Sequence, residues 1–532
     1  MGIFISWQKI YECIAVSVLF TALFCATTFK LLGILQSSGY STKKLFGWTR
    51  QKNNTAIQRR VMLFMLMALA YAVLALCFSF TGKWSAIIGL LAFVKFFVLF
   101  IIANKRIALR VPLTATPRLK RLTVILFLVA GALVYASVTM LNYADMVLGN
   151  IFFKMLRYLP LSLFPLLSLP IIAVANFLSK GIEVPRNHSF VRKAKNRLAK
   201  SNLTVIAITG SYGKTSTKMI LRNILSQKYR VLSTPRSHNT PMGLALTINK
   251  NDLEDFDILI AEMGARRTGD ISELCEMCPP DYSAITGICS QHLESFLTEE
   301  NIVKAKGEIL TATKKCAVLA AEVYPLYYNY FCRKYKVDCL SDVVTTPDGT
   351  DFTLTLNGEQ RRAHTKLLGK HNAENIALAA TLANLIGMTI DEIVEAIAEL
   401  DFVEHRLQLI KSNGVNILDD GYNSNVRGAA AALEVLRSFE GRKVVVTPGL
   451  VELGYLEESE NQSLGEKLKG FDLVILVGET LIAPVKKGYL DTGGDPARLK
   501  VVPTLARAQQ ELKLYLNPGD TVLFLNDLPD VY

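Results

Sequence analysis

Acidic residues are nearly absent from the first 200 residues of this 532-residue chain, which hold 25 Lys and Arg but only Glu12, Asp145 and Glu183. The remaining 332 residues reverse the balance, with 34 basic and 43 acidic side chains. A basic region can indicate nucleic-acid binding. Here, however, the basic residues lie between long apolar runs, which is the pattern that the positive-inside bias of membrane proteins produces. We therefore expect membrane lipids, and no nucleic acid, as partners of this region.

Paired cysteines are also scarce. Nine cysteines are scattered along the chain, and Cys275 and Cys278 form its one CxxC pair. A structural zinc site would require two more ligands at a matching spacing. The pattern therefore favours reduced, structural thiols. The sequence also has no internal repeat and no low-complexity tract.

Five apolar runs are long enough to cross a hydrocarbon layer about 30 Å thick, at about 20 residues each. They are 11–31, 61–80, 85–103, 122–142 and 158–178. With five spans, all three strongly basic segments (30–60, 104–121 and the stretch after 178) fall on one side. This predicts a multi-pass protein of the inner or plasma membrane, with its N-terminus outside and its catalytic part in the cytoplasm. Lys95, inside the third run, either contacts a lipid phosphate or faces the interior of the bundle.

From residue 203, short β-branched runs alternate with amphipathic helices, which indicates parallel α/β sheets. One series of expected strands is 205–209, 257–261, 283–288 and 316–320, and a second is 415–418, 443–446, 473–477, 500–502 and 521–525. We expect an α-helical membrane bundle followed by two α/β domains. The expected bounds are 1–180 for the membrane domain, 181–202 for a basic linker, 203–405 for the central domain and 406–532 for the C-terminal domain.

The strongest local signal is a glycine-containing loop between an expected strand and an expected helix at 217–225. It reads Thr209-Gly210-Ser211-Tyr212-Gly213-Lys214-Thr215-Ser216. Glycines let a backbone wrap around a phosphate, N–H groups at the start of a helix bind its oxygens, and a lysine offsets its charge. The general P-loop pattern would place another glycine at Ile208. The loop therefore predicts a phosphate site of a shorter type.

This loop resembles that of the Mur ligases, in particular the branch that adds D-alanyl-D-alanine to the peptidoglycan precursor. The resemblance continues in register to about residue 455 in the segments Asn239-Thr240-Pro241-Met242-Gly243, Glu262-Met263-Gly264, Gln291-His292-Leu293-Glu294, Ala305-Lys306-Gly307-Glu308, Gly369-Lys370-His371-Asn372-Ala373-Glu374-Asn375, Arg406, Asp419-Asp420-Gly421-Tyr422-Asn423-Ser424-Asn425 and Glu452-Leu453-Gly454. It implies a P-loop-type Mur ligase central domain that binds ATP and a Rossmann-like C-terminal Mur ligase domain.

The resemblance also implies two Mg²⁺ sites. Thr215 and Glu262 would hold the first ion, and Glu262 with His292 would contact the second. Lys306 matches a family lysine that is carbamylated, which turns a cation into an oxygen ligand of the second ion. Lys214, His292 and Lys306 would then be the catalytic residues.

Nucleotide contacts are implied for the whole loop from Gly210 to Ser216 and for residues farther along the chain. His371, Asn372 and Asn375 would bind the nucleotide from a helix. Arg406 and Asp420 would reach it from the hinge and the last domain, so that domain closure completes the site.

Several segments depart from the family pattern. The N-terminal domain that holds the UDP-sugar is missing, and the apolar runs stand in its place. Residues 447–450 replace a G-D-M segment, residues 525–530 replace a basic segment near the amino-acid site, and Gly287 stands where asparagine is usual. The segments expected to bind ATP are thus retained, while those expected to bind the acceptor and the amino acid have changed.

Together these features predict an ATP-dependent ligase that acts through an acyl phosphate. It would add an amino acid or short peptide to the carboxylate of a cell-envelope precursor, which we expect to be lipid-linked. A membrane-bound synthase of the poly-γ-glutamate type and a non-ligase ATP-binding scaffold remain as alternatives. The sequence does not identify the amine donor or the acceptor.

Overall fold

The computed structural model of the chain describes residues 7–50, 94, 98, 101–102, 112–148, 164–235, 238–290, 293–422 and 425–526. The chain divides into two compact units between Arg186 and Asn187. This division falls inside one long helix, α8 (Ser168–Ala199). The stretch expected as a linker, 181–202, is therefore largely helical.

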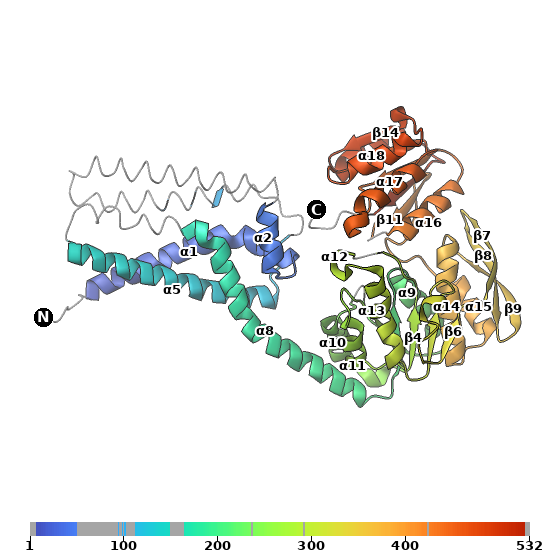
Figure 1. Ribbon diagram of the computed structural model, residues 1–532, viewed down its shortest axis with the longest axis horizontal. Helices are drawn as coiled ribbons and strands as arrows, with labels where there is room; N and C mark the ends of the chain where they lie inside the picture. The colour runs from blue at the N-terminus through green and yellow to red at the C-terminus, as the bar shows by residue number, and fades with distance from the viewer. Residues whose placement is uncertain are drawn as a thin grey trace. The chain divides into compact units, whose positions relative to one another are not determined.

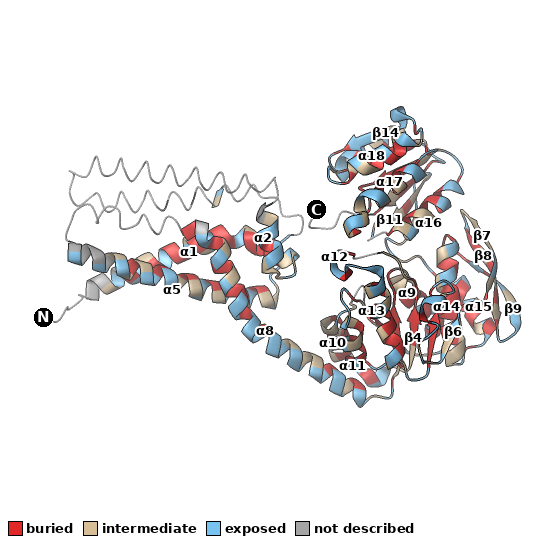
Figure 2. Cartoon of the chain, viewed as in Figure 1, coloured by how far each residue is buried: buried red, intermediate tan, exposed pale blue. Residues whose placement is uncertain are grey.

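The N-terminal unit is built from helices (Figure 1). Those described besides the start of α8 are α1 (Trp7–Ser37), α2 (Thr42–Arg50), α5 (Pro117–Leu148) and the short η3 (Phe164–Leu167). Phe20 and Phe24 of α1 and Leu122 and Leu126 of α5 share one core and are almost fully buried. Many large apolar side chains on the same helices are exposed instead, as the pale blue residues of Figure 2 show.

Two of the predicted membrane runs have a counterpart among the described helices. Cys13–Ser37 and Pro117–Leu141 are long and apolar enough to cross a bilayer. The second run and nearly all of the third, Lys95 included, lie outside the described residues. The fifth run is described from Phe164 onward as η3 and the start of α8, and this part does not qualify as a span. The count of five spans therefore stays a prediction.

The second unit begins with a six-stranded parallel sheet in the order β2-β3-β1-β4-β5-β6. Its strands are β1 (Thr204–Thr209), β2 (Val231–Ser233), β3 (Ile258–Glu262), β4 (Tyr282–Ile285), β5 (Cys316–Leu319) and β6 (Lys334–Lys336). Helices cover both faces, so the residues of β1 from Val205 onward are buried: Val205 packs in one core cluster and Ile206 in the other. Burial on both faces explains why the strand reads as a continuous apolar run.

The helices around this sheet carry most of the predicted motifs. They are α9 (Lys214–Ser226), α10 (Pro241–Lys250), α11 (Asp270–Met277), α12 (Leu293–Phe296), α13 (Glu299–Ala312), α14 (Lys370–Ile386) and α15 (Ile390–Ala398), with the short η4 (Leu253–Asp255) and η5 (Tyr324–Tyr327). An antiparallel sheet that the sequence did not predict lies between β6 and α14. Its strands are β7 (Leu340–Thr346), β8 (Gly349–Leu356) and β9 (Glu359–Thr365).

A second six-stranded sheet forms the last part of the chain, in the order β10-β11-β15-β12-β13-β14. Only β10 at its edge runs antiparallel to its neighbour. The strands are β10 (Gln408–Ser412), β11 (Val415–Asp420), β12 (Lys443–Thr447), β13 (Leu473–Val477), β14 (Leu499–Val502) and β15 (Thr521–Leu525). The helices are α16 (Val426–Arg437), α17 (Glu457–Lys467), α18 (Ile482–Asp491) and α19 (Leu505–Tyr515), with the short η6 (Gly454–Leu456) and η7 (Pro496–Arg498). The predicted α/β architecture of this half of the chain is confirmed.

Candidate active site

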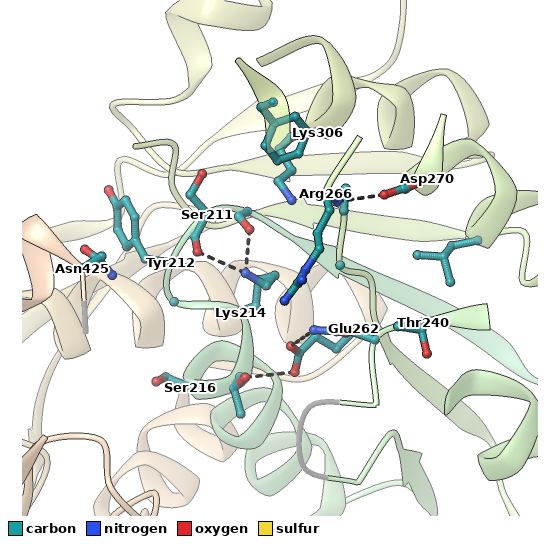
Figure 3. A pocket seen from close by; sticks show the side chains of 18 of the residues that line it. Ser211, Tyr212, Lys214, Ser216, Thr240, Glu262, Arg266, Asp270, Lys306 and Asn425 are labelled. Atoms are coloured by element: carbon teal, nitrogen blue, oxygen red, sulfur yellow. Dashed lines mark hydrogen bonds between the residues drawn. The ribbon is translucent and has the colours of Figure 1, made fainter. Parts of the chain in front are cut away.

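A cavity of about 470 Å³ opens where β1 and β3 of the first sheet end (Figure 3). The carboxyl ends of parallel strands are the usual place for ligands in open α/β sheets. Ten predicted site residues line the cavity: Gly210, Ser211, Tyr212, Gly213, Lys214, Thr215, Ser216, Glu262, Lys306 and Arg406. The structure thus brings together residues that lie up to 196 positions apart in the sequence.

The loop after β1 has the backbone of a phosphate cradle. Gly213 has φ 77°, and a Cβ there would lie 2.7 Å from Asn375 Oδ1, so only glycine fits. Helix α9 begins at Lys214 without a side-chain cap, which leaves its first N–H groups for an anion. The Lys214 ammonium group donates to the carbonyl oxygens of Gly210 at 2.7 Å and Ser211 at 3.1 Å. These features fit a bound polyphosphate.

Glu262, the last residue of β3, is a carboxylate of the cavity that accepts hydrogen bonds from three side chains. Its side chain is 1% exposed. Oε2 accepts hydrogen bonds from the Thr215 hydroxyl at 3.0 Å and from Lys218 Nζ at 2.9 Å, and Oε1 accepts one from Asn239 Nδ2 at 3.2 Å. Burial raises the pKa of Glu262, but the charges of Lys218 and Lys214 and these hydrogen bonds outweigh it and lower the pKa overall. The carboxylate is therefore ionised.

Thr215 and Glu262 fit one Mg²⁺ by their chemistry. A hydroxyl and a carboxylate supply the hard oxygen ligands that Mg²⁺ prefers, and in phosphate-binding enzymes phosphate oxygens and water supply the others. Both oxygens lie beside the phosphate cradle, 3.0 Å from each other. Such a site uses few protein ligands, and the described part of the chain holds no group of three His, Cys, Asp or Glu side chains placed for a metal.

Lys218 belongs to this cluster although the sequence did not point to it. Its side chain is fully buried, and the Glu262 carboxylate offsets its charge. Removing one partner of such a buried pair is strongly destabilising, because it leaves the other charge uncompensated. Lys218 follows Lys214 by four residues and so lies on the same face of α9. This spacing is the only feature of the sequence that could have placed Lys218 near the phosphate loop.

Lys306 is 3% exposed on α13 and lines the cavity. Burial lowers the pKa of Lys306 to about 7, and the charge of Lys214 acts in the same direction. Its Nζ lies 5.7 Å from the centre of the Phe296 ring, and no ion pair with another described residue is present. His292, its predicted partner at a second metal, lies outside the described residues. The second metal site therefore stays a prediction.

The hinge before the last sheet contributes Arg406. Burial lowers the pKa of Arg406, against the charge of Asp420, and the guanidinium lies 4.7 Å from the centre of the Tyr422 ring. Its neighbours His405 and Leu407 have φ 58° and 49°, values that non-glycine residues seldom adopt. Asp420 accepts a hydrogen bond from the Leu407 N–H at 3.1 Å. Asp420 thus fixes the hinge and does not line the cavity.

Three other residues predicted to bind the nucleotide do not line the cavity. Asn372 Nδ2 donates to the Leu368 carbonyl at 2.8 Å, and Asn375 Oδ1 accepts from the Thr217 hydroxyl at 3.1 Å. Burial lowers the pKa of His371 to about 4, and its Nδ1 has no hydrogen-bond partner in the described part of the chain. Their contact with a nucleotide stays a prediction.

Comparison with known families accounts for this arrangement. Residues 208–383 match the family model of the Mur ligase middle domain, and residues 405–526 match that of the Mur ligase glutamate ligase domain. Together the two matches cover more than half of the 532 residues. The chain belongs to the Mur ligase family.

Two similar relatives are named UDP-N-acetylmuramoyl-tripeptide--D-alanyl-D-alanine ligase. The protein of Bacillus subtilis (strain 168) is 32% identical to this Mur ligase over 306 residues, which are 53% of this chain and 66% of the relative. The protein of Escherichia coli (strain K12) is 32% identical over 292 residues, which are 52% and 64% of the two chains. The chain thus spans slightly less than two thirds of the length of these relatives.

Solved structures of the family show the same fold. A MurF ligase from Thermotoga maritima, solved in complex with ADP, superposes with a TM-score of 0.58 at 28% identity, covering 65% of this chain and 81% of that one. MurF from Acinetobacter baumannii gives a TM-score of 0.59 at 23% identity, covering 65% and 78%.

The glycine at 287, where the resemblance leads us to expect asparagine, is explained by Tyr212. A Cβ at position 287 would overlap the Tyr212 ring. The Tyr212 hydroxyl donates a hydrogen bond to Glu322 and accepts one from Arg427 Nη1 at 2.8 Å, and Arg427 forms an ion pair with Glu322. Arg427 belongs to α16, so Tyr212 of the phosphate loop connects the middle domain of this Mur ligase with its last domain.

The two altered segments near the expected amino-acid site contact each other. Asn526 Nδ2 donates to the Gly449 carbonyl at 2.7 Å, and the Asn526 N–H donates to the Asp420 carbonyl at 3.1 Å. None of the described residues of the two segments lines the cavity. Residues 527–530 of the second segment lie outside the described residues.

Proposed function

We propose that this Mur ligase forms an amide bond between the carboxylate of a peptidoglycan-type precursor and the amino group of an amino acid or dipeptide, at the expense of ATP. The cavity carries the proposal, because a phosphate cradle, the Thr215–Glu262 oxygen pair and the buried Lys306 all face it. Phosphate binding alone requires no buried lysine. The names of the relatives support the same reaction class.

The chemistry explains why ATP is needed. A carboxylate oxygen attacks the γ-phosphorus of ATP, the bond from that phosphorus to ADP breaks, and an acyl phosphate forms. The amine nitrogen then attacks the acyl carbon, the bond from carbon to the phosphate oxygen breaks, and the amine loses a proton as inorganic phosphate leaves. Because the first step brings two anions together, groups that offset negative charge lower its barrier.

Each group of the cavity has a proposed part in this step. Lys214 and the start of α9 would hold the phosphates, and Thr215 with Glu262 would hold Mg²⁺. Bound Mg²⁺ would offset charge on the phosphate oxygens. Arg406 would add a cation from the hinge, so that the site is complete only when the last domain is in place.

We also propose a second Mg²⁺ site that includes Lys306. A carbamate on Lys306 would be an anionic oxygen ligand, and with Glu262 and His292 it would hold the second ion. The position of Lys306 on the cavity wall and its burial support this assignment. A lysine kept as a cation would add a fourth positive group to the wall that Lys214, Arg266 and Arg406 already line.

The membrane region bears on the choice of the acceptor. The relatives are named for a UDP-linked muramoyl tripeptide and D-alanyl-D-alanine, which makes these the first substrates to try. We propose a lipid-linked form of the precursor as the preferred acceptor, because apolar side chains such as Phe29, Leu128 and Phe177 are exposed on helices of the N-terminal unit. Exposed apolar surface of this extent is stable in a bilayer. The membrane domain 1–180 would then span the bilayer. The basic linker 181–202 and the ligase domains 203–405 and 406–532 would lie on its cytoplasmic side.

Acceptor-dependent release of ADP by the purified full-length protein tests the proposal. Lys214→Ala, Glu262→Ala and His292→Ala should each lower turnover about a hundredfold, because each removes a group at a developing charge. Lys228→Ala is the matched control, since this lysine is exposed and pairs with Glu392 outside the cavity. Turnover in all three variants equal to that of the control would refute the site.

The products separate the alternatives. A single adduct of donor and acceptor is the expected product. A ladder of products from one amino acid would indicate a polymer synthase of the poly-γ-glutamate type. ATP binding without turnover on the UDP-linked or lipid-linked acceptor would indicate a scaffold.

A further inference from the structure

The loop between β3 and α11 is held in place from several sides. Asp270 Oδ2 accepts hydrogen bonds from the backbone N–H groups of Arg266 at 2.8 Å and Arg267 at 2.9 Å. Glu308, two residues beyond Lys306 on α13, accepts from the N–H groups of Gly269 at 2.6 Å and Ser272 at 3.0 Å. The backbone that carries Arg266 is therefore fixed to the same helix as the buried lysine.

The Arg266 side chain points from this loop into the cavity (Figure 3). Its backbone serves the loop, while its guanidinium forms no ion pair with any residue that the structure describes. Arg267, the next residue, is also exposed but does not line the cavity. One of two adjacent arginines is thus presented to the site by a rigid loop.

Among the lining residues from Ala265 to Leu274, Arg266 is basic, and Asp270 and Glu273 are acidic. Another acidic residue that lines the cavity is Glu262. Lys218 already offsets the charge of Glu262, and Asp270 Oδ2 is taken up by backbone N–H groups. The phosphate loop has its own lysine and helix start, whereas the wall from Ala265 to Leu274 contains none of the predicted nucleotide contacts. This wall is therefore a candidate place for a group other than the phosphates in the cradle.

We propose that Arg266 binds a carboxylate or phosphate group of the acceptor and so determines which acceptor is used. The planar guanidinium group suits the two oxygens of such an anion, which it binds with two parallel hydrogen bonds. This inference rests on the proposed function and adds a recognition residue to it. The same chemistry would also suit the γ-phosphate of ATP, and the experiment separates the two sources.

Arg266→Gln in the full-length protein is the test, with Arg267→Gln as the matched control. We expect the KM for the UDP-linked muramoyl tripeptide to rise tenfold or more in Arg266→Gln, and ATP affinity without acceptor to change less than twofold. Arg267→Gln should leave both values unchanged. Arg266→Lys should recover part of the loss, because it restores the charge without the paired donors. Equal melting temperatures of the two glutamine variants would show that the fold is intact.

Direct calorimetric binding of the tripeptide makes the inference independent of turnover. Tripeptide binding that depends on Arg266, without any turnover, would refute the proposed function and support the inference. Turnover with the same KM in Arg266→Gln and wild type would support the proposed function and refute the inference. A loss of ATP affinity in Arg266→Gln would assign the residue to the γ-phosphate and overturn the inference. Wild-type protein that binds neither the UDP-linked nor the lipid-linked tripeptide would overturn it as well.

Discussion

At the scale of single residues, the cavity is organised by charges that have been removed from water. Glu262 and Lys218 are both almost completely buried and offset each other at 2.9 Å. Without Lys218 the carboxylate would lose its nearest positive charge, which is costly for a buried anion. The pair therefore keeps a charged carboxylate beside Thr215, where a metal ion is proposed to bind.

Tyr212 and Gly287 should be energetically coupled. Gly287→Ala puts a Cβ into the space of the Tyr212 ring, and overpacking of this kind costs about 1–3 kcal/mol. Thermal unfolding should show this loss, together with weaker ATP binding because Tyr212 belongs to the phosphate loop. Adding Tyr212→Ser should restore most of both. The same loss from Gly287→Ala in the Tyr212→Ser background would show that the ring is not the obstacle.

Lys306 should not tolerate replacement by another cation. If it acts as a carbamate, Lys306→Arg is as inactive as Lys306→Ala, and a small carboxylate at high concentration partly rescues the alanine variant. Lys304→Arg on the exposed side of α13 is the matched control and should be fully active. Turnover measurements on these variants decide whether Lys306 acts as a carbamate or as a cation. An active Lys306→Arg enzyme would show that the residue works as a cation.

At the scale of helices and strands, contiguous patterns were informative and isolated residues were not. The nine strands expected in the two α/β sheets are present within a few residues. Most of them, though not β11 and β14, are buried on both faces, and such strands give uninterrupted apolar runs. The edge strands β2 and β6 have three residues each and give no such run, and the half-exposed β7–β9 sheet was missed as well.

The same limit applies to the site. The phosphate loop was found because its residues are adjacent in the sequence. Lys218 and Arg266 belong to no quoted motif. The packing of α9 brings Lys218 to Glu262, and the anchored loop after β3 brings Arg266 to the cavity. The supporting role of Asp420 was equally invisible, because it depends on a hydrogen bond to the backbone of the hinge.

One ion pair should decide how α5 and α8 pack. Glu183, one of three acids in the first 200 residues, binds Arg121 through two hydrogen bonds of 2.6 and 2.9 Å. Glu183→Gln should lower the melting temperature of the full-length protein in detergent, because it removes the negative charge that pairs with Arg121. Adding Arg121→Gln should recover part of the loss. Lys120→Gln, an exposed neighbour, should have no effect, and an equal loss in that control would refute the role of the pair.

At the scale of the whole molecule, the uneven charge and the exposed apolar helices predict an orientation in the membrane. A reporter fused after Tyr532 should behave as cytoplasmic, and one inserted between Tyr143 and Gly149 as external, because the basic segments stay on the side where ATP is available. Enzymatic reporters with opposite compartment preferences measure both positions. A cytoplasmic signal from the inserted reporter would contradict the predicted topology.

The central claim is that the chain activates a carboxylate by transferring phosphate to it, and isotope transfer tests this most directly. The UDP-linked muramoyl tripeptide would be labelled with ¹⁸O in its reacting carboxylate and incubated with ATP, Mg²⁺, D-alanyl-D-alanine and the full-length protein. An acyl phosphate retains a carboxylate oxygen between carbon and phosphorus, and cleavage of the carbon–oxygen bond leaves that oxygen on the phosphate. The account predicts one ¹⁸O atom in each inorganic phosphate released with the product. Amide formation that leaves the phosphate unlabelled would contradict it.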